Sequence, residues 1–260
     1  MQSIVILGGG NMGGAMAQSW QQAGGLRLHV VEMDAARREA LTKKGIACVA
    51  SLAEAPKADA YLLAIKPQHY AETRPSIAAH CGHDAPLILS IMAGIGCDQL
   101  APLSPHVVRV MPNLPALIGE SMSVLYTPAL DTATRATLTR WFEIIGRTAW
   151  VEQEDDLHAV TAISGSGPAY LFALMEALTE AAIAQGLSPA LADTLVRQTI
   201  KGAALLAAAS PLPAGTLRAQ VTSKGGTTEA ALASFAAGGL SGLVADAVTA
   251  AAHRSRALAG

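Results

Sequence analysis

The sequence predicts an α/β protein in two parts: a mostly parallel, doubly wound sheet in residues 1–152 and an all-α region in residues 153–260. Two observations support this prediction. Up to about residue 150, short β-rich runs alternate with helical stretches, which is the pattern of parallel strands connected by helices. From about Glu152 onward the β-rich runs cease, and alanine-rich helical stretches occupy the remainder of the chain.

The first part is predicted to contain strands separated by helices. Each predicted strand is a short run of β-branched or aliphatic residues bounded by glycine, proline or polar residues. The helices include an amphipathic stretch at residues 34–45, which Gly45 closes. The predicted strands lie at residues 3–7, 28–31, 60–65, 87–92, 107–111, 123–126 and 148–152, and the last helix of this part lies at 128–146.

The second part is predicted to contain helices only. The stretch at residues 168–186 is apolar on nearly every side, so it is expected to be buried on most sides. Ser188 and Pro189 then provide an N-cap and a first-turn proline for a helix that continues to about residue 209. A final helix is expected to end near Leu258.

The composition indicates a protein that associates with itself. Hydrophobic residues make up 51% of the chain and charged residues only 15%, and small side chains account for most of the surplus. Such a chain suits closely packed helices and a large subunit interface. The net charge of −2 and the scattered Lys and Arg residues argue against a nucleic-acid partner and against binding to an anionic membrane surface.

The cysteines and the N-terminus indicate a cytoplasmic protein. Cys48, Cys81 and Cys97 are odd in number and lack metal-ligand spacing, so we interpret them as buried thiols in a reducing compartment and expect no metal site. The N-terminus lacks the basic and long apolar segments of a signal peptide. The longest stretch without formal charge, residues 157–175, contains His158 and "GSGP", which argues against a membrane span.

A glycine-rich segment, "ILGGGNMGG", follows the first predicted strand and opens a helix. In its GxGxxG pattern the first glycine permits a tight turn, the second lets backbone approach a pyrophosphate, and the third lets helix pack on strand. The N–H groups at the helix start would face the phosphates. This context predicts a Rossmann dinucleotide-binding domain, with a purely structural turn as the alternative. The predicted cofactor-binding residues here are Leu7, Gly8, Gly9, Gly10, Asn11, Met12 and Gly13.

Glu32 lies just past the second predicted strand, 22 residues after Gly10. A carboxylate at this place binds the hydroxyls of the adenine ribose, and it would repel a 2′-phosphate. The sequence therefore favours NADH slightly over NADPH. Arg37 and Arg38 keep NADPH open, since an arginine at the start of the next helix could hold the phosphate, and an ordinary surface role for Glu32 is the alternative.

Three later strand exits lie on the same predicted edge of the sheet, where ligands of open α/β sheets bind. These exits are "AIKP", "MAG" and "MPN", and each taken alone could be an ordinary turn. Together they fit the nicotinamide half of a cofactor site. The predicted cofactor-binding residues of this group are Ala64, Ile65, Lys66, Pro67, Met92, Ala93, Gly94 and Asn113.

The motifs "TAISGSGPAYLFALMEAL" and "VTSKGGTTEAAL", preceded in order by "GGGNMG", "AIKP" and "VRVMPN", resemble the pyrroline-5-carboxylate reductase family over essentially the whole chain. The resemblance implies reduction of the C=N bond of 1-pyrroline-5-carboxylate by NAD(P)H, which gives L-proline. It also implies a Rossmann domain followed by a helical dimerisation domain. The helices of two subunits are expected to interlace in a homodimer, and such dimers often assemble further.

The same resemblance implies that the second glycine loop, residues 221–232, binds the substrate. Backbone N–H groups of Gly226 and Thr227 would hold the substrate carboxylate, with Ser223 nearby, and the hydroxyl of Thr228 would face the ring nitrogen as the catalytic group. Physically, this is an anion site built from unpaired N–H groups at a helix start. The alternative is that the threonines only cap the helix. The implied substrate-binding residues are Ser223, Gly225, Gly226, Thr227 and Thr228.

Four residues depart from the usual pattern of the family. Leu114 stands where threonine is common, Met92 where alanine is usual, and Lys224 where proline is common. Leu114 and Met92 would line the nicotinamide end and so widen the range of imines accepted. Ser51 stands where many members carry a ribose-contacting asparagine, and its hydroxyl could substitute as a cofactor ligand.

Three other functions are open at this point. A 3-hydroxyacid dehydrogenase needs a lysine after its glycine-rich motif, and "SGSGPAYLFALMEAL" contains none. A reductase of other cyclic imines would fit the departures at Leu114 and Met92. A dinucleotide-binding sensor without catalysis would not need the second anion site.

Overall fold

The computed structural model describes residues 2–82 and 84–259 and divides into two compact units. The sheet unit consists of Met1–Ser166 and Ala250–Gly260, and the helical unit consists of Gly167–Thr249. The sheet unit therefore continues beyond residue 152, through α6 (Asp156–Val160) and the π-helical turn η4 (Thr161–Gly165).

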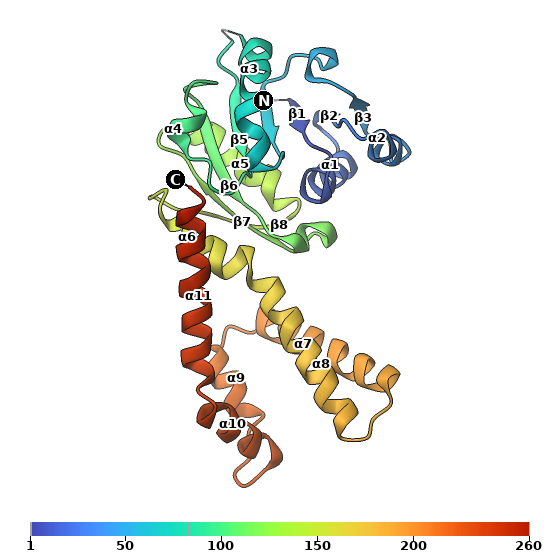
Figure 1. The fold of residues 1–260 in the computed structure, drawn as a ribbon, viewed down its shortest axis with the longest axis vertical. Coiled ribbons are helices and arrows are strands. Elements are labelled where there is room, and N and C mark those ends of the chain that lie inside the picture. Colours follow the sequence, from blue (N-terminus) through green and yellow to red (C-terminus); the bar gives the residue numbers. More distant parts are fainter. Residues whose placement is uncertain (1, 83, 260) are drawn as a thin grey trace. The chain divides into compact units, whose positions relative to one another are not determined.

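The sheet unit contains one eight-stranded sheet with the order β3-β2-β1-β4-β5-β6-β7-β8 (Figure 1). Strands β1 to β6 are parallel, β7 is antiparallel to β6, and β8 is parallel to β7. The prediction of a mostly parallel sheet is confirmed. The strands are β1 (Ser3–Leu7), β2 (Arg27–Val31), β3 (Ala47–Val49), β4 (Ala60–Leu63), β5 (Leu87–Ser90), β6 (Val107–Met111), β7 (Ser121–Tyr126) and β8 (Gly146–Trp150).

The side chains of β1 alternate between two buried clusters, one on each face of the sheet. Ile4 and Ile6 belong to the first cluster, and Val5 and Leu7 belong to the second. Burial on both faces is what a doubly wound sheet requires. The helices that accompany the sheet are α1 (Asn11–Ala23), α2 (Ala35–Thr42), α3 (Tyr70–Cys81), α4 (Cys97–Leu100) and α5 (Thr132–Glu143), with short 3₁₀ turns η1 (Leu52–Glu54), η2 (Pro67–His69) and η3 (Leu114–Ile118).

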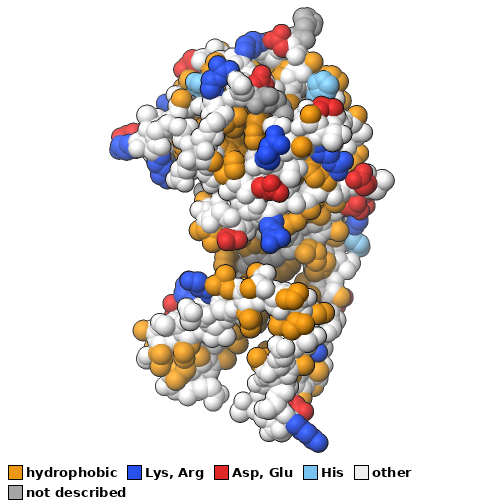
Figure 2. All heavy atoms as spheres, turned by 180° about the vertical axis from the view of Figure 1, so that it is seen from behind, with side chains coloured by type: hydrophobic (Ala, Val, Ile, Leu, Met, Phe, Trp, Pro, Cys, Tyr) orange, Lys and Arg blue, Asp and Glu red, His pale blue; other side chains and the backbone are white. Residues whose placement is uncertain are grey.

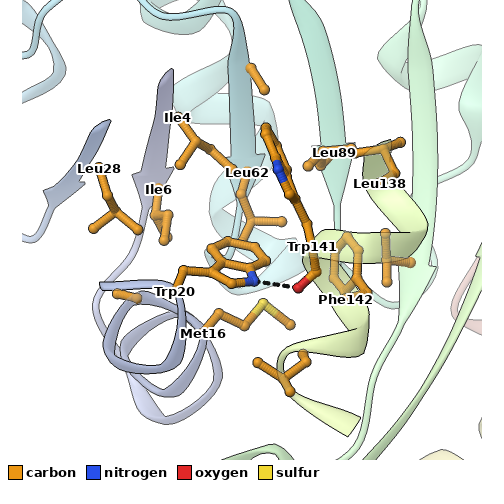
Figure 3. Packing of buried hydrophobic residues seen from close by; sticks show 14 of the residues in the cluster. Ile4, Ile6, Met16, Trp20, Leu28, Leu62, Leu89, Leu138, Trp141 and Phe142 are labelled. Atoms are coloured by element: carbon orange, nitrogen blue, oxygen red, sulfur yellow. Dashed lines mark hydrogen bonds between the residues drawn. The ribbon is translucent and has the colours of Figure 1, made fainter. Parts of the chain in front are cut away.

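The first cluster is centred on aromatic side chains from α1 and α5 (Figure 3). The ring of Trp20 meets the ring of Phe142 edge-on, with centroids 5.6 Å apart and planes at 84°. Its indole N–H donates to the carbonyl oxygen of Trp141 at 2.6 Å, so the polar atom of this buried ring is satisfied. This contact fixes α5 against α1 and thereby fixes the helix that follows the first glycine loop.

The helical unit differs because its helices bury few of their own residues. Its elements are α7 (Gly167–Ala184), α8 (Pro189–Ala209), α9 (Ala214–Gln220), α10 (Thr227–Ala237) and most of α11 (Leu240–Ala257). The predicted start of α8 is confirmed, with Ser188 as the N-cap that accepts from the N–H of Leu191.

None of the residues of α7 is buried in the single chain, although the sequence led us to expect burial on most sides. Phe172 is 54% exposed and Leu171 is 52% exposed, and hydrophobic side chains lie open on the surface of these helices (Figure 2). An apolar helix left open in one chain indicates that another chain covers it. No single helix in the described ranges is long and apolar enough to span a membrane. Only α10 and α11 taken together, with a bend of 53° between them, have the length and composition of a membrane span.

Candidate cofactor and substrate sites

The carboxyl ends of the parallel strands meet at one edge of the sheet. The N–H of Ala64, just past β4, donates to the oxygen of Leu7 at 2.9 Å, and the N–H of Ile91, just past β5, donates to the oxygen of Leu63 at 3.2 Å. Chain order reverses between β1 and β4, so the segments after these strands diverge there. A crevice at such a reversal is where open α/β sheets bind ligands.

Two glycines pack the first glycine loop tightly onto its surroundings. Gly8 has φ of +104°, and a Cβ there would lie 2.6 Å from the oxygen of Ala64. A Cβ on Gly13 would lie 2.1 Å from the oxygen of Gly8. Because both obstacles are backbone atoms, a side chain at either place would force the loop to move.

Gly10 is different, because no atom among the residues that the structure describes lies within 4 Å of the place where its Cβ would be. It is the N-cap of α1, and it offers no side chain to the N–H groups of the first turn. Those of Asn11, Met12 and Gly13 have no partner within the ranges that the structure describes. An open backbone next to unpaired N–H groups at the start of a 13-residue helix fits the pyrophosphate of a dinucleotide.

Glu32 is 8% exposed, and its carboxylate is held by backbone. One oxygen accepts from the N–H of Gly9 at 2.8 Å, and the other accepts from the N–H of Asp34 at 2.9 Å. Arg38 donates to the backbone oxygens of Glu32 and Met33. The carboxylate therefore braces the glycine loop, and its remaining lone pairs are what a ribose hydroxyl would use.

The other residues predicted to bind cofactor have varied surroundings. Lys66 is exposed at the start of η2, and Ser51 donates to the carboxylate of Glu54 at 2.6 Å. Met92 is only 2% exposed, within the second cluster. A Cβ on Gly94 would lie 2.3 Å from the oxygen of Leu258, so this loop packs against the C-terminal segment.

Asn113 is buried, and its amide joins two neighbouring segments. Its Nδ2 donates to the oxygen of Ser164 at 3.0 Å, and its Oδ1 accepts from the N–H of Met122 at 2.9 Å. Both ends of the amide are therefore engaged in holding η4 and β7 to the end of β6. The backbone beside it carries Leu114, which is 42% exposed.

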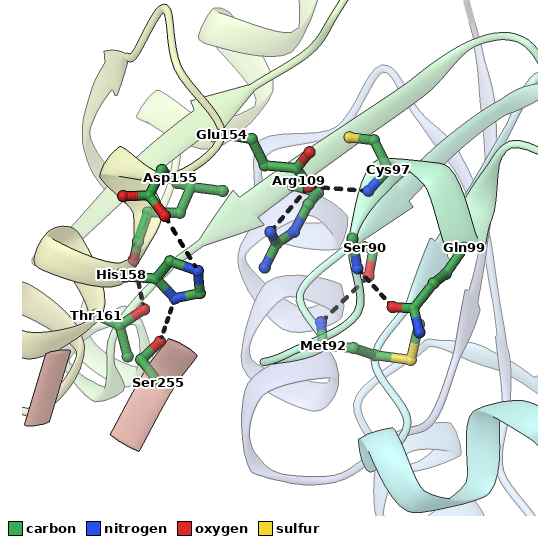
Figure 4. A network of polar contacts seen from close by, with 12 residues as sticks. Ser90, Met92, Cys97, Gln99, Arg109, Glu154, Asp155, His158, Thr161 and Ser255 are labelled. Atoms are coloured by element: carbon green, nitrogen blue, oxygen red, sulfur yellow. Dashed lines mark hydrogen bonds and ion pairs between the residues drawn. The ribbon is translucent and has the colours of Figure 1, made fainter. Parts of the chain in front are cut away.

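A polar network beside the sheet, with no recognisable motif in the sequence, is centred on the buried side chain of Arg109 (Figure 4). The guanidinium of Arg109 pairs with Glu154 at 2.9 Å, and the same carboxylate oxygen accepts from the N–H of Cys97 at 2.8 Å. Burial, and the nearby Glu154 charge, raise the pKa of the Cys97 thiol to about 12. This thiol is thus protonated at neutral pH and is not a nucleophile.

His158 belongs to the same region and connects α6 to the C-terminal segment. Its Nδ1 lies 2.8 Å from the hydroxyl of Ser255, and Asp155 pairs with Arg256 at 3.2 Å. Burial lowers the pKa of His158, so its imidazole is held in the neutral form. These contacts explain why the segment after residue 249 belongs to the sheet unit.

The second glycine loop lies in the helical unit and begins α10. Gly226 is the N-cap, with φ −88° and ψ 173° and no side-chain cap, and Gly225 before it has φ of +70°. The N–H of Gly226 donates to the oxygen of Ser223 at 3.0 Å, so it is used within the loop. The N–H groups of Thr227 and Thr228 have no acceptor in the described part of the chain.

Glu229 is the residue of this loop that the sequence analysis passed over. Its carboxylate accepts from the N–H of Gly225 at 2.6 Å. The spacing from the N-cap to Glu229 is that of a capping box, and this was the available signal. Here the carboxylate binds one residue earlier than a capping box would place it, because Ser223 already takes the N–H of Gly226.

Comparison with known proteins identifies the relatives of both units. The family model for pyrroline-5-carboxylate reductase dimerisation matches residues 154–258, and the model for NADP oxidoreductase, coenzyme F420-dependent, matches residues 3–94. The pyrroline-5-carboxylate reductase of Haemophilus influenzae is 38% identical over 97% of this chain and 96% of its own.

Solved structures agree with this match. A pyrroline-5-carboxylate reductase from Coxiella burnetii superimposes with a TM-score of 0.91 at 30% identity, over 99% of this chain and 98% of its own. The Plasmodium falciparum pyrroline carboxylate reductase with NADP bound gives a TM-score of 0.84 at 28% identity, over 98% of this chain and 100% of its own.

Proposed function

The chain belongs to the pyrroline-5-carboxylate reductase family, and from this premise we propose that its two glycine loops bind the two reactants. The protein is an NAD(P)H-dependent oxidoreductase that reduces the C=N bond of 1-pyrroline-5-carboxylate, giving L-proline. One observation carries the proposal: both loops open onto a helix N-terminus that has no side-chain cap. Pyrophosphate and carboxylate are both anions that accept hydrogen bonds from such N–H groups.

We assign the cofactor to the carboxyl edge of the sheet. The open space at Gly10 and the unpaired N–H groups of Asn11 and Met12 suit the pyrophosphate. When bound, the reduced nicotinamide supplies a hydride. The proposed cofactor contacts are Leu7, Gly8, Gly9, Gly10, Asn11, Met12, Gly13, Glu32, Ser51, Ala64, Ile65, Lys66, Pro67, Met92, Ala93, Gly94 and Asn113.

We assign the substrate to the loop before α10. Its carboxylate would accept from the N–H groups of Thr227 and Thr228, with Ser223, Gly225 and Gly226 shaping the turn. A protonated C=N group is a good hydride acceptor, so the protein chiefly has to position it. The hydroxyl of Thr228 has no partner elsewhere in the described chain and would bind the ring nitrogen as it becomes an amine.

The role of Thr228 is tested by replacing it in two ways. Because a positioned hydrogen-bonding group contributes about 10²-fold or more where it operates, Thr228→Ala should lower kcat about 100-fold, and Thr228→Ser should recover most of it. Nicotinamide absorbance after addition of 1-pyrroline-5-carboxylate measures both. An unchanged rate in Thr228→Ala would remove Thr228 from the mechanism. Equal turnover of a cyclic imine without a carboxylate would favour a broader imine reductase, for which the exposed Leu114 is the first candidate.

We propose a preference for NADH. The support is the buried carboxylate of Glu32, which is fixed at the end of β2 and would repel a 2′-phosphate. Parallel assays with NADH and NADPH test it. A preference for NADPH that is lost in Arg37→Ala would assign the phosphate to the helix start instead.

The proposal includes an interlaced homodimer in the cytoplasm. Self-association is supported by the dimerisation match and by the exposed apolar side chains of α7. Interlacing predicts that Phe172→Glu gives a monomer by light scattering, while Glu72→Gln on α3 of the sheet unit leaves the dimer intact. The cytoplasmic location rests on three unpaired cysteines, and cell fractionation tests it.

A further inference from the structure

The second glycine loop contains a carboxylate that has no role in the proposed reaction. Glu229 lies in the first turn of α10 and accepts from the N–H of Gly225 at 2.6 Å. This side chain is exposed, so burial does not force the contact. A negative group beside a site for a negative substrate needs a reason, because like charges repel.

Packing does little to hold Gly225 in place. Its φ of +70° lies in the left-handed region, and no atom of residues 2–82 or 84–259 lies within 4 Å of its Cβ position. The contact with Glu229 is therefore a specific restraint on this residue. A hydrogen bond to an ionised acceptor is stronger than one between neutral groups.

The restraint also decides which N–H groups remain for the substrate. Glu229 takes the N–H of Gly225, and the oxygen of Ser223 takes that of Gly226. The next two N–H groups, on Thr227 and Thr228, have no acceptor in the described part of the chain. They lie on consecutive residues of a regular helix turn, which fixes their directions relative to each other.

We propose that Glu229 is a positioning residue for the substrate: its carboxylate fixes Gly225 so that the N–H groups of Thr227 and Thr228 are arranged in advance for the substrate carboxylate. This inference rests on the proposed function of the loop. It assigns to Glu229 an effect on substrate binding and none on hydride transfer or cofactor binding. A ligand site that is arranged in advance gains affinity because less ordering is lost on binding.

The test compares Glu229→Ala, Glu229→Gln and a matched control. Glu229→Gln keeps an acceptor oxygen without the charge, and Glu72→Ala removes the equivalent first-turn acid of α3, where no glycine loop precedes the helix. We expect KM for 1-pyrroline-5-carboxylate to rise about tenfold in Glu229→Ala with kcat within about twofold, and to rise about threefold or less in Glu229→Gln. Glu72→Ala should match the parent protein in KM, kcat and the Kd for NADH.

Hydrogen exchange gives a second readout that needs no turnover. The Gly225 amide should exchange faster in Glu229→Ala than in the parent protein, and it should stay protected in Glu229→Gln. Faster exchange with an unchanged KM would overturn the proposal, as would a lower KM in both Glu229 variants, which would make Glu229 a repulsive group. A parent protein inactive on 1-pyrroline-5-carboxylate would instead reject the proposed function, and the exchange result would still report on the Gly225 contact.

Discussion

The two glycine loops of this protein share one plan and differ in what holds them. Each ends in a glycine N-cap without a side-chain cap, Gly10 in one and Gly226 in the other. In each, the N–H of the preceding glycine donates to a glutamate, Gly9 to Glu32 and Gly225 to Glu229. The plan is a short backbone turn restrained by one carboxylate, followed by unpaired N–H groups.

The two restraining glutamates lie at different distances along the chain from the glycines that they bind. Glu32 lies 23 residues from its glycine and is buried, whereas Glu229 lies four residues from its own and is exposed. The first loop also packs against Ala64, whereas no atom of the described residues lies within 4 Å of the Cβ position of Gly225. The first loop thus depends on the tertiary fold and the second on local geometry. Substitutions in the first should damage folding or cofactor binding, and those in the second should damage substrate binding.

The largest effect is expected from Gly13→Ala. The added Cβ would lie 2.1 Å from the oxygen of Gly8, and the backbone has no room to yield. Overpacking of this kind costs about 2 kcal/mol or more, which corresponds to a fall in Tm of about 4–8 °C for a unit of this size. A thermal melt and a fluorescence titration with NADH measure it. A Tm equal to that of the parent protein would show that the first loop can accommodate the added Cβ and is not tightly packed.

Gly10→Ala is the matched substitution in the same loop. Its Cβ would enter open space, and the φ of −66° at Gly10 suits any residue, so the Tm should stay within about 1 °C of the parent value. The Kd for NADH should rise about 100-fold, because the methyl group occupies the approach of the pyrophosphate. Tight NADH binding by this variant would place the pyrophosphate elsewhere.

Gly225→Ala tests the second loop. A left-handed φ costs a residue with a Cβ about 1–2 kcal/mol, and no clash adds to that cost. We expect a small loss of stability, a raised KM for the substrate, and an unchanged Kd for NADH. A weakened affinity for NADH without a change in KM would reverse the assignment of the two loops.

The smallest effect concerns pH and the buried contacts of the sheet unit. Burial lowers the pKa of His158 in the folded protein below its ordinary value of about 6.5, with the charges of Arg109 and Arg256 acting in the same direction and Asp155 opposing them. Its contribution to stability is therefore fully present above about pH 6.5 and is lost as the pH falls below that value. Melts between pH 8 and pH 5.5 should show a shallower loss in His158→Gln than in the parent protein.

His80 is the control for this pH effect, because burial lowers its pKa as well. His80→Gln should remove a separate part of the stability loss that the parent protein shows between pH 8 and pH 5.5. If the parent protein and His158→Gln lose stability identically between pH 8 and pH 5.5, the contact between His158 and Ser255 does not control the anchoring of the C-terminal segment.

The sequence was sufficient to predict the parallel sheet, the change from strands to helices near residue 150, and the position of the first glycine loop. These features depend on local patterns, such as the alternation along Ser3–Leu7 and the glycine spacing after it. The short strand Ala47–Val49 was missed, because three residues are too few to show a periodic pattern. The π-helical turn at Thr161–Gly165 was also missed, because its composition does not distinguish it from other short helical turns.

Long-range polar contacts could not be predicted from the sequence. Glu154 accepts from both Arg109 and the N–H of Cys97, and Asn113 joins two segments by both ends of its amide. Partners that lie 45 or 51 residues apart leave no periodic trace in one sequence. A capping role for Glu229 could have been predicted, because its spacing from Gly226 matches a capping box. The residue that it binds, however, depends on the turn before the helix.

The open apolar face of α7 has a consequence for the life of the protein in the cell. In the proposed dimer, side chains such as Phe172 and Leu171, exposed in the single chain, are covered only when a second chain binds. A newly made subunit therefore presents a surface of the kind that chaperones and proteases recognise, and the time it spends exposed depends on how many other copies are present. Expression level should thus set the fraction of chains that survive, so a weakly expressed copy of the gene would yield less enzyme than its transcript level suggests.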